Sequence, residues 1–218
     1  MPASLTHILR HPQTADPGPP PILMLLHGVG SNERDLMGLA PQLDGRFLVI
    51  SVRAPHVLGP DSYGWYHVQF TPSGPVIEPE EAERSRLLIL QFVEEAVIKY
   101  HADPRRVFLM GFSQGCIMSL SAALSQPAKF AGVVGMSGRL LPNIDSLIQD
   151  SEALHRLAVL VVHGAADTVL PIQDGRAIRD KLIALGVDVE YREYPMAHQV
   201  SAQSLSDIAG WLQHRLMT

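Results

Sequence analysis

The chain has 218 residues, of which 46% are hydrophobic and 18% are charged, and its formal net charge is −5. The hydrophobic content supplies a sizeable core, which excludes a disordered chain. The acidic balance, with no stripe of Lys and Arg, argues against nucleic-acid binding. A single cysteine, Cys116, excludes an intramolecular disulfide and argues against a metal site built on cysteines. The length fits one domain over residues 1–218.

The first 21 residues do not have the pattern of a targeting segment, because they contain six prolines and no continuous apolar run. Every apolar run in the chain is much shorter than the roughly 20 residues that a membrane-spanning helix needs. We therefore expect a soluble, cytoplasmic protein with no membrane span, and a single cysteine agrees with a reducing compartment.

Strand-like apolar runs alternate with helical patterns along the chain. A short edge strand is predicted at Leu5–Leu9, with the strand Ile22–Leu26 as its buried neighbour. After them we predict, in order, a strand at Phe47–Val52, a helix at Pro79–Tyr100, a strand at Val107–Met110, a helix at 114–125, strands at Phe130–Met136 and Ala158–Val162, a helix at Pro171–Leu185, a strand at Val187–Tyr194 and a helix at Ala202–Leu216. This alternation predicts an α/β fold, with a mostly parallel central sheet flanked by helices on both faces.

The segment Gly111-Phe112-Ser113-Gln114-Gly115 lies between a predicted strand and a predicted helix. This is the context that the Gly-x-Ser-x-Gly pattern of a serine nucleophile requires. The glycines allow a sharp turn that exposes the Ser113 hydroxyl at the sheet edge, above the free N–H groups that begin the helix. An ordinary Gly-Ser turn is the alternative interpretation.

A serine hydroxyl needs a neighbouring base, and the ten histidines must be separated by position. His198 follows the last predicted strand, and Asp167 follows the strand Ala158–Val162, so both can reach the nucleophile and its edge of the sheet. Asp167 would orient the imidazole and stabilise its protonated form. A solvated loop histidine and a helix-capping aspartate are the alternatives. His27 and His163, which each end a strand and precede glycine, are expected to be structural or to support the site residues from behind.

Attack on an acyl carbon leaves negative charge on the carbonyl oxygen, and each preorganised N–H donor stabilises it by about 2.7–4 kcal/mol. One donor is expected to be the N–H of Gln114, directly after the nucleophile. The second is expected from the segment His27-Gly28-Val29-Gly30-Ser31, where we choose the N–H of Val29. A plain glycine-rich turn is the alternative, and a phosphate loop is disfavoured because no Gly-Lys-Ser/Thr follows.

These segments resemble the α/β-hydrolase superfamily, and within it the phospholipase/carboxylesterase group, which includes bacterial carboxylesterases and acyl-protein thioesterases. The matching segments cover nearly the whole chain and are Leu26-His27-Gly28-Val29-Gly30, Gly64-Trp65, Arg106 to Gly115, His163-Gly164-Ala165-Ala166-Asp167 and Ala197-His198. The chain order of serine, aspartate and histidine is also the one found in α/β-hydrolases.

The resemblance implies an α/β-hydrolase fold with no large cap domain, and hydrolysis of carboxylic or thio-esters without a metal or other cofactor. The site residues that it implies are the triad Ser113, Asp167 and His198 and the oxyanion donors Val29 and Gln114. It also implies that the 54–75 loop lines the acyl site, which makes Trp65 a candidate substrate-binding residue. Members of the group often form homodimers, so a homodimer is a further expectation. The Trp65–Pro79 segment departs from the pattern of the eukaryotic thioesterases, which favours carboxylesterase activity.

We therefore expect a serine carboxylesterase that cleaves small-molecule esters through an acyl-enzyme on Ser113, with thioesters as an open substrate class. Two alternatives are a non-catalytic ligand-binding protein on the same scaffold and a small serine peptidase. Four apolar residues either line an acyl pocket or pack the core: Leu58, Trp65, Phe70 and Leu170. Cys116, one turn into a predicted helix, is expected to be structural.

Overall fold

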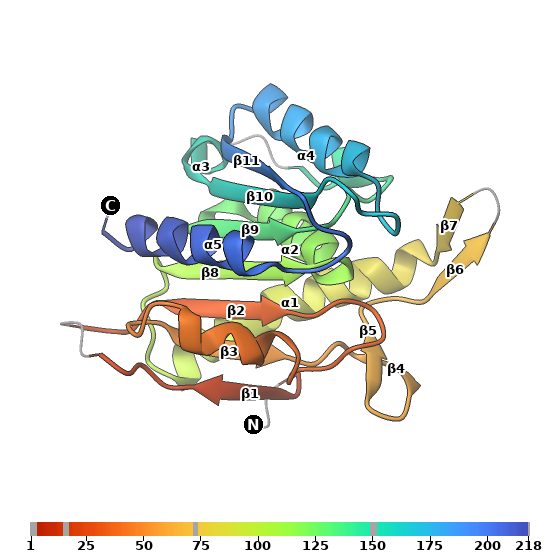
Figure 1. The fold of residues 1–218 in the computed structure, drawn as a ribbon. Helices are drawn as coiled ribbons and strands as arrows, with labels where there is room; N and C mark the ends of the chain where they lie inside the picture. The colour runs from red at the N-terminus through yellow and green to blue at the C-terminus, as the bar shows by residue number, and fades with distance from the viewer. Residues whose placement is uncertain (1–3, 15–17, 72–73, 149–151, 218) are drawn as a thin grey trace.

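The computed structural model describes residues 4–14, 18–71, 74–148 and 152–217. Its centre is a seven-stranded sheet with the order β1-β3-β2-β8-β9-β10-β11 (Figure 1). The strands are β1 (His7–Arg10), β2 (Ile22–Leu26), β3 (Leu48–Val52), β8 (Val107–Phe112), β9 (Gly132–Met136), β10 (Ala158–Gly164) and β11 (Asp188–Tyr194). β1 pairs antiparallel with β3, and the remaining neighbours pair in parallel. The prediction of a mostly parallel sheet is confirmed.

The prediction that the strand Ile22–Leu26 is the neighbour of the N-terminal edge strand is wrong. β1 does lie at the edge, but it pairs with β3, where Leu9 is opposite Ile50. β2 lies instead between β3 and β8, in parallel register with both. An apolar run specifies that a strand is buried, but its partner depends on the path of the connecting chain.

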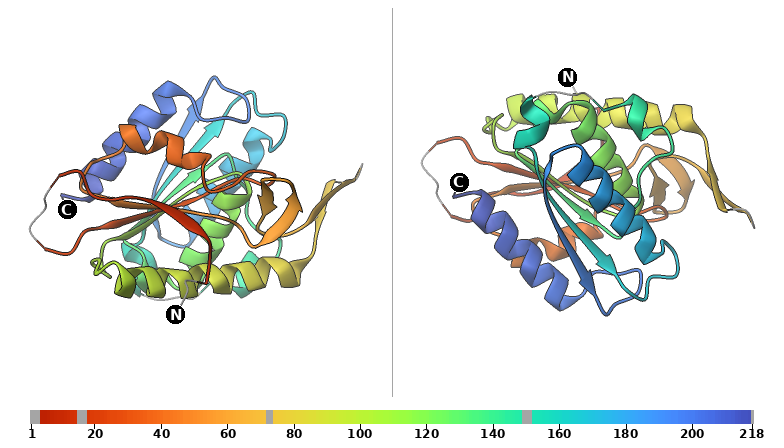
Figure 2. Two further views of the ribbon diagram at one scale, coloured as in Figure 1. Left: turned by 90° about the horizontal axis from the view of Figure 1, so that it is seen from below. Right: turned by 90° about the horizontal axis from the view of Figure 1, so that it is seen from above.

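Helices cover both faces of the sheet, as predicted (Figure 2). One face is packed by α1 (Pro79–Lys99), α2 (Gln114–Ser125) and α4 (Ile172–Ala184). The opposite face is packed by the 3₁₀ helix η1 (Leu36–Gln42) and by α5 (Ala202–Arg215). Successive residues of a strand point to opposite faces, so Met24 of β2 joins the first core and Leu25 joins the second.

The predicted 54–75 loop contains two short hairpins. They are formed by β4 (His56–Gly59) with β5 (Ser62–Gly64) and by β6 (Val68–Thr71) with β7 (Gly74–Ile77). Three further short elements are η2 (Pro127–Lys129), η3 (Ile144–Ser146) and α3 (Glu152–Arg156). All of these elements are too short for a hydrophobic period to identify them from sequence.

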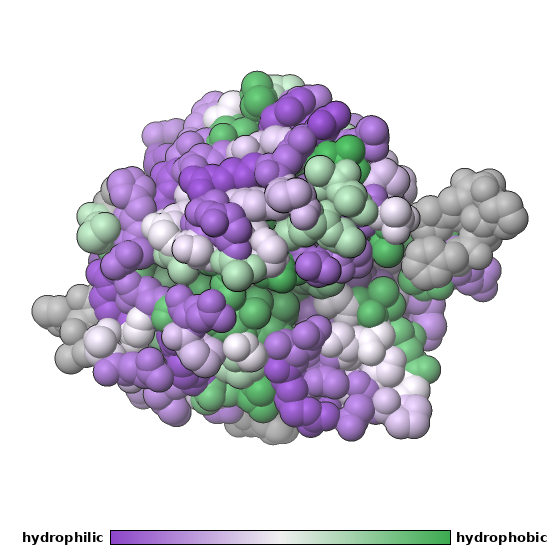
Figure 3. All heavy atoms as spheres, viewed as in Figure 1, coloured by the Kyte–Doolittle hydropathy of each residue, from purple (hydrophilic) through white to green (hydrophobic). Residues whose placement is uncertain are grey.

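The surface seen from the side of α5 and η1 carries both hydrophilic and hydrophobic residues, with hydrophobic ones in its middle and toward the side where the strands end (Figure 3). Two exposed valines at that side, Val29 and Val169, line a pocket at the carboxyl ends of the strands. Within the described part of the chain, none of the helices combines the length and the apolar composition that crossing a membrane requires.

Candidate active site

Loops from four strands meet at one edge of the sheet. The loop after β2 carries Val29, the turn after β8 carries Ser113, and the loops after β10 and β11 carry Asp167 and His198. Because the carboxyl ends of parallel strands point the same way, these loops bring distant parts of the sequence together.

Ser113 lies in a strained turn between β8 and α2. Its φ is +54° and its ψ is −118°, a conformation that residues other than glycine rarely adopt. The turn is fixed on both sides: the Ser113 N–H donates to the Met136 carbonyl at 2.9 Å, and the Ser113 carbonyl accepts from the Ile117 N–H at 3.2 Å. This is the sharp turn that the Gly-x-Ser-x-Gly pattern predicts.

The glycines around Ser113 are required by close backbone contacts. A Cβ at Gly115 would overlap the Leu26 carbonyl group, and a Cβ at Gly111 would overlap the carbonyl of Gly115. A Cβ at Gly28 would come within 3.3 Å of the Ser113 Cβ. The turn that carries Ser113 and the loop after β2 therefore approach each other as closely as their backbones allow.

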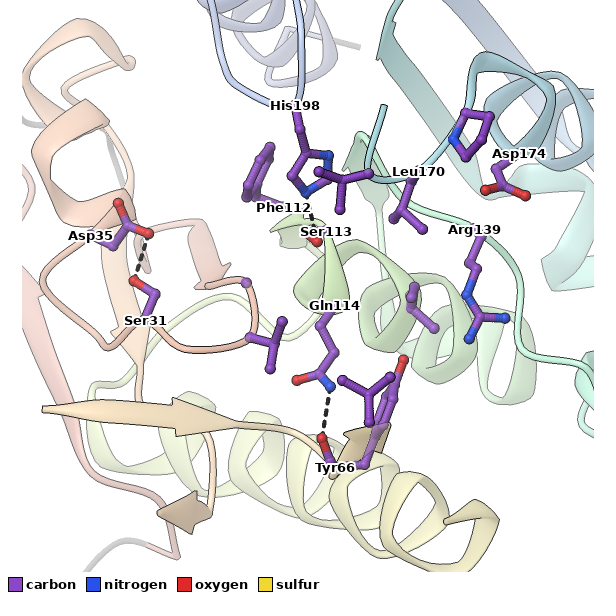
Figure 4. Close-up of a pocket in the computed structure, with 16 residues that line it drawn as sticks. Ser31, Asp35, Tyr66, Phe112, Ser113, Gln114, Arg139, Leu170, Asp174 and His198 are labelled. Atoms are coloured by element: carbon purple, nitrogen blue, oxygen red, sulfur yellow. Dashed lines mark hydrogen bonds between the residues drawn. The ribbon is translucent and has the colours of Figure 1, made fainter. Parts of the chain in front are cut away.

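His198 and Asp167 form a hydrogen-bonded series with Ser113. Figure 4 shows the bond between His198 and Ser113. His198 Nε2 lies 3.0 Å from Ser113 Oγ, and His198 Nδ1 lies 2.7 Å from Asp167 Oδ2. A carboxylate only accepts, so Nδ1 carries the proton and Nε2 can accept from the serine hydroxyl. The structure thus brings the three predicted side chains together in the geometry of nucleophile, base and orienting group.

The Asp167 carboxylate is buried and has partners on both oxygens. Its Oδ1 accepts from the N–H groups of Val169 and Leu170, each at 2.9 Å. Burial alone would raise the pKa of Asp167, but the hydrogen bonds from His198 and from these two N–H groups outweigh burial and lower its pKa. The carboxylate therefore stays ionised at neutral pH and can stabilise a protonated His198.

Both predicted oxyanion residues line the pocket beside Ser113. Across the described residues, neither the Val29 N–H nor the Gln114 N–H donates a hydrogen bond. The adjacent Gly30 N–H does, to the Tyr63 carbonyl at 2.8 Å. Gln114 begins α2, where the first N–H groups have no partner within the helix. Two undonated N–H groups near the nucleophile are what the binding of an oxyanion requires.

The Gln114 side chain has a role that the sequence pattern did not reveal. Its Oε1 accepts from the Trp65 N–H at 2.6 Å, and its Nε2 donates to the Tyr66 carbonyl at 2.8 Å (Figure 4). Ser85 of α1 donates its hydroxyl to the Trp65 carbonyl. The segment 65–66 is therefore fixed to α2 on one side and to α1 on the other.

Trp65 does not line the pocket, contrary to the prediction. Its side chain is 0% exposed, and its indole N–H donates to the His27 carbonyl at 3.0 Å. The next residue, Tyr66, lines the pocket in its place. Of the other apolar candidates, Leu170 lines the pocket, Leu58 is not among its described lining residues, and the side chain of Phe70 lies outside the described residues.

An ion pair anchors the far end of the loop after β2. Arg53 donates from Nε and from Nη2 to the two carboxylate oxygens of Glu33, each at 2.6 Å. The guanidinium also lies 4.5 Å from the centre of the Tyr63 ring. Glu33 is 3% exposed, and its hydrogen bonds with Arg53 lower its pKa to about 2. No local pattern in the sequence links these residues, which lie 20 positions apart.

His27, His163 and Cys116 have structural positions, as predicted. His27 is fully buried, with Nδ1 2.7 Å from the Gly28 carbonyl and Nε2 accepting from the Ala54 N–H at 3.1 Å. His163 is also fully buried and donates from Nε2 to the Leu170 carbonyl at 2.8 Å. Cys116 has 0% exposure in α2, and burial raises the pKa of its thiol to about 12.

The pocket at Ser113 has a volume of about 570 Å³, within the range of small-molecule sites. Its apolar lining residues include Val29, Val68, Phe112, Ile117, Val169 and Leu170. Arg139 and Asp174 add opposite charges on the side away from Ser31 and Asp35 (Figure 4). Among the described residues, no carboxylate lies within ion-pair distance of Arg139. The pocket therefore suits an apolar chain next to Ser113 and a polar group further along.

The pocket does not contain a cluster of three metal-ligating side chains among the described residues. The described part of the chain has such a cluster elsewhere, formed by His56, His67 and Glu81, and none of these three lines the pocket. The residues in the pocket are suited to acid–base and nucleophilic chemistry.

Comparison with known proteins gives the same family as the motifs. A family model described as Phospholipase/Carboxylesterase matches residues 13–216. Acyl-protein thioesterase 1 of Gibberella zeae is 31% identical over 132 residues, which are 59% of this chain and 54% of that protein. Carboxylesterase SOBER1 of Arabidopsis thaliana is 32% identical over 136 residues, which are 57% of this chain and 59% of that protein. The matched segments thus span little more than half the length of these two relatives.

Solved structures support the fold assignment. The chain matches a crystal structure of esterase PE8 with a TM-score of 0.83 and 23% identity, over 98% of this chain and 99% of that one. It matches the Bacillus cereus carboxylesterase with a TM-score of 0.82 and 20% identity, over 97% of this chain and 94% of that one. The α/β-hydrolase fold predicted from the motifs is confirmed.

Proposed function

The chain belongs to the phospholipase/carboxylesterase family, and on that premise we propose that it is a serine carboxylesterase acting on esters of small or acyl-chain substrates. The observation that carries this proposal is the hydrogen-bonded series from Ser113 through His198 to Asp167, at the edge of a largely apolar pocket. A protein that only binds ligands does not need a strained serine beside an oriented imidazole.

The first half-reaction transfers the acyl group to the enzyme. Ser113 Oγ forms a bond to the acyl carbon while His198 Nε2 takes the hydroxyl proton, and the carbonyl electron pair moves onto oxygen. The N–H groups of Val29 and Gln114 stabilise that oxyanion. The bond to the leaving group then breaks, and the alcohol or thiol departs with the proton from His198.

The second half-reaction releases the acid. A water molecule gives its proton to His198 and bonds to the acyl carbon, and the oxyanion forms again at the same two N–H groups. The bond to Ser113 Oγ breaks, the serine recovers its proton from His198, and the carboxylic acid leaves. Asp167 keeps the imidazole oriented and balances its positive charge in both halves.

The names of the relatives support two kinds of leaving group, a thiol and an alcohol, since one relative compared above is named a thioesterase and the other a carboxylesterase. The proposal names carboxylic esters first, because nothing in the pocket requires a thiol leaving group. A peptidase on the same residues is not favoured, because none of these relatives is named as one. The expected homodimer and cytoplasmic location stay predictions.

The test is hydrolysis of p-nitrophenyl esters with acyl chains from two to sixteen carbons, by the wild type and by Ser113→Ala, in the presence of EDTA. We expect the variant to lose about 10⁴–10⁶-fold in kcat, as when the nucleophile of a triad is removed. The chain-length profile of the wild type then measures how much of the pocket an acyl chain can fill.

A second serine of α2 provides the control. Ser121 is fully buried, and its hydroxyl donates to the Ile117 carbonyl at 2.7 Å, within the helix. Ser121→Ala should keep wild-type turnover. Equal turnover by wild type and Ser113→Ala would overturn the proposed nucleophile. If neither protein hydrolyses any ester and a fluorophosphonate fails to label Ser113, the protein is a ligand-binding one.

A further inference from the structure

Three potential metal ligands converge outside the pocket. They come from three separate elements: His56 from β4, His67 from the segment between β5 and β6, and Glu81 from the first turn of α1. One ligand atom from each lies within 4.8 Å of the other two. The rings of His56 and His67 meet edge to face, with centres 5.3 Å apart.

An ordinary histidine–glutamate pair explains only part of this cluster. His67 Nδ1 lies 2.9 Å from Glu81 Oε2, and the His67 N–H also donates to that oxygen at 2.8 Å. His56 is different: its Nδ1 is 3.9 Å from Glu81 Oε1, beyond hydrogen-bond distance. In the part of the chain that the structure describes, the His56 ring makes no hydrogen bond, although 22% exposure leaves it mostly buried. A ligand shared by all three side chains would give His56 a partner.

We propose that His56, His67 and Glu81 form a binding site for a zinc ion, with solvent completing its coordination. Two imidazoles and one carboxylate are a recurrent zinc ligand set, whereas magnesium and calcium prefer oxygen ligands alone. Zinc bonds of 2.0–2.1 Å in a tetrahedron separate ligand atoms by about 3.3 Å. The His67–Glu81 distance is already close to that value, so His56 alone must move inward. His67 is 52% exposed, which leaves the ion a route in from solvent.

The position of the site links it to the pocket wall. His67 lies between Tyr66 and Val68, which both line the pocket. The Tyr66 carbonyl accepts from the Gln114 side chain, directly after the proposed nucleophile. A zinc ion would join this part of the pocket wall, Tyr66 to Val68, to the hairpin β4–β5 and to the start of α1. It takes no part in the proposed reaction, and its effect on turnover should appear in KM.

The first experiment measures zinc directly, without any substrate. Equilibrium dialysis of the wild type should give one zinc ion per chain, with no comparable binding of magnesium. His56→Gln, His67→Asn and Glu81→Gln should each weaken binding by at least about tenfold. His214→Gln changes an exposed histidine of α5 far from the cluster and should bind zinc like the wild type. At a zinc concentration 100 times Kd, the wild-type Tm should rise by about 5–10 °C, and that of Glu81→Gln should not.

Two results would overturn the proposal. One is equal zinc binding by the wild type and all three cluster variants. The other is binding that His198→Ala abolishes and the cluster variants keep, because zinc would then occupy the proposed catalytic histidine. A kinetic test of the site also rests on the proposed function. Zinc should change the KM for p-nitrophenyl esters in the wild type and leave it unchanged in Glu81→Gln. If no ester is hydrolysed at all, the dialysis result still decides whether the zinc site exists.

Discussion

The two halves of the candidate site are held in place in different ways. The turn that carries Ser113 is fixed by backbone against backbone, with glycines at 111 and 115 where any side chain would overlap a carbonyl. The loop that carries Val29 is fixed by hydrogen bonds and charge: the Gly30 N–H and the Ser31 carbonyl bond to the Tyr63 backbone, the Trp65 indole donates to the His27 carbonyl, and the Glu33–Arg53 ion pair anchors the far end. One half therefore depends on steric fit, and the other depends on hydrogen bonds and charge.

This difference predicts different responses to mutation. Backbone overlap cannot be relieved by a rotamer change, so variants of the Ser113 turn should fail abruptly. Hydrogen bonds and ion pairs can be removed one at a time, so variants of the loop after β2 should lose stability in steps. Changes in pH should also affect the loop, because it contains a titratable ion pair, more than they affect the packed turn.

The largest effect is expected from Gly115→Ala. The new Cβ would overlap the Leu26 carbonyl, so either β2 or α2 must move. We expect a loss of more than about 4 kcal/mol in the free energy of unfolding, together with loss of esterase activity. Urea denaturation and turnover of p-nitrophenyl esters measure the two effects.

Gly210→Ala is the matched control for this variant. Gly210 lies in α5 and is exposed, and a Cβ there would meet no heavy atom within 4 Å. Since alanine favours a helix over glycine by about 1 kcal/mol, Gly210→Ala should be as stable as the wild type or more stable. Equal stability of the two alanine variants would show that steric fit does not hold the Ser113 turn.

A smaller effect is expected from Glu33→Gln, and it should depend on pH. The folded pKa of Glu33 is about 2, below its ordinary value of 4.5. A lowered carboxyl pKa contributes stability that is fully present above the unfolded pKa and is lost as the pH falls through the folded pKa. The shift corresponds to about 3 kcal/mol at pH 7. The difference in unfolding free energy between wild type and variant should therefore fall to less than half between pH 7 and pH 3.

Glu94→Gln serves as the control for a surface ion pair. Glu94 is 59% exposed and pairs with Lys129, and such pairs contribute about 0–1 kcal/mol. Its variant should differ little from the wild type at either pH. If the effect of Glu33→Gln is the same at pH 7 and pH 3, the ion pair does not cause it.

The smallest effect on stability is expected from Gln114→Met. Methionine keeps the length of the side chain and removes both hydrogen bonds to the segment 65–66, at about 0.5–1.5 kcal/mol each. The backbone N–H of residue 114 is retained, so the proposed oxyanion donor is still present. We expect kcat/KM for p-nitrophenyl esters to fall by about 10–100-fold, because the pocket wall is no longer fixed.

Gln114→Glu separates hydrogen bonding from packing at the same position. A glutamate can still accept from the Trp65 N–H, but when ionised it cannot donate to the Tyr66 carbonyl and it buries a charge there, so its activity at neutral pH should be no higher than that of Gln114→Met. If Gln114→Met has wild-type kcat/KM, the two hydrogen bonds do not position the wall.

The sequence predicted the half that depends on steric fit better than the half that depends on hydrogen bonds and charge. Glycines at fixed positions around Ser113 report the turn directly, and strand order along the chain places Asp167 and His198 at the same edge. The contacts of Gln114, Glu33 and Arg53 carry no such local signal, because each joins segments that are at least 20 positions apart. The wrong assignment of Trp65 has the same origin. Trp65 and Tyr66 are neighbouring aromatic residues, and the composition of the loop does not say which of the two faces the pocket.

The buried thiol described above has a practical consequence for spectroscopy. Cys116 is the single cysteine of the chain, it is fully buried, and the pKa of its thiol is raised to about 12, so almost no thiolate exists near neutral pH. A second cysteine, introduced at an exposed position such as Gly210 in α5, would be the one thiol that maleimide dyes or nitroxide spin labels modify. The native chain thus serves as its own cysteine-free background, and distances across the molecule can be followed in solution without first deleting a core residue.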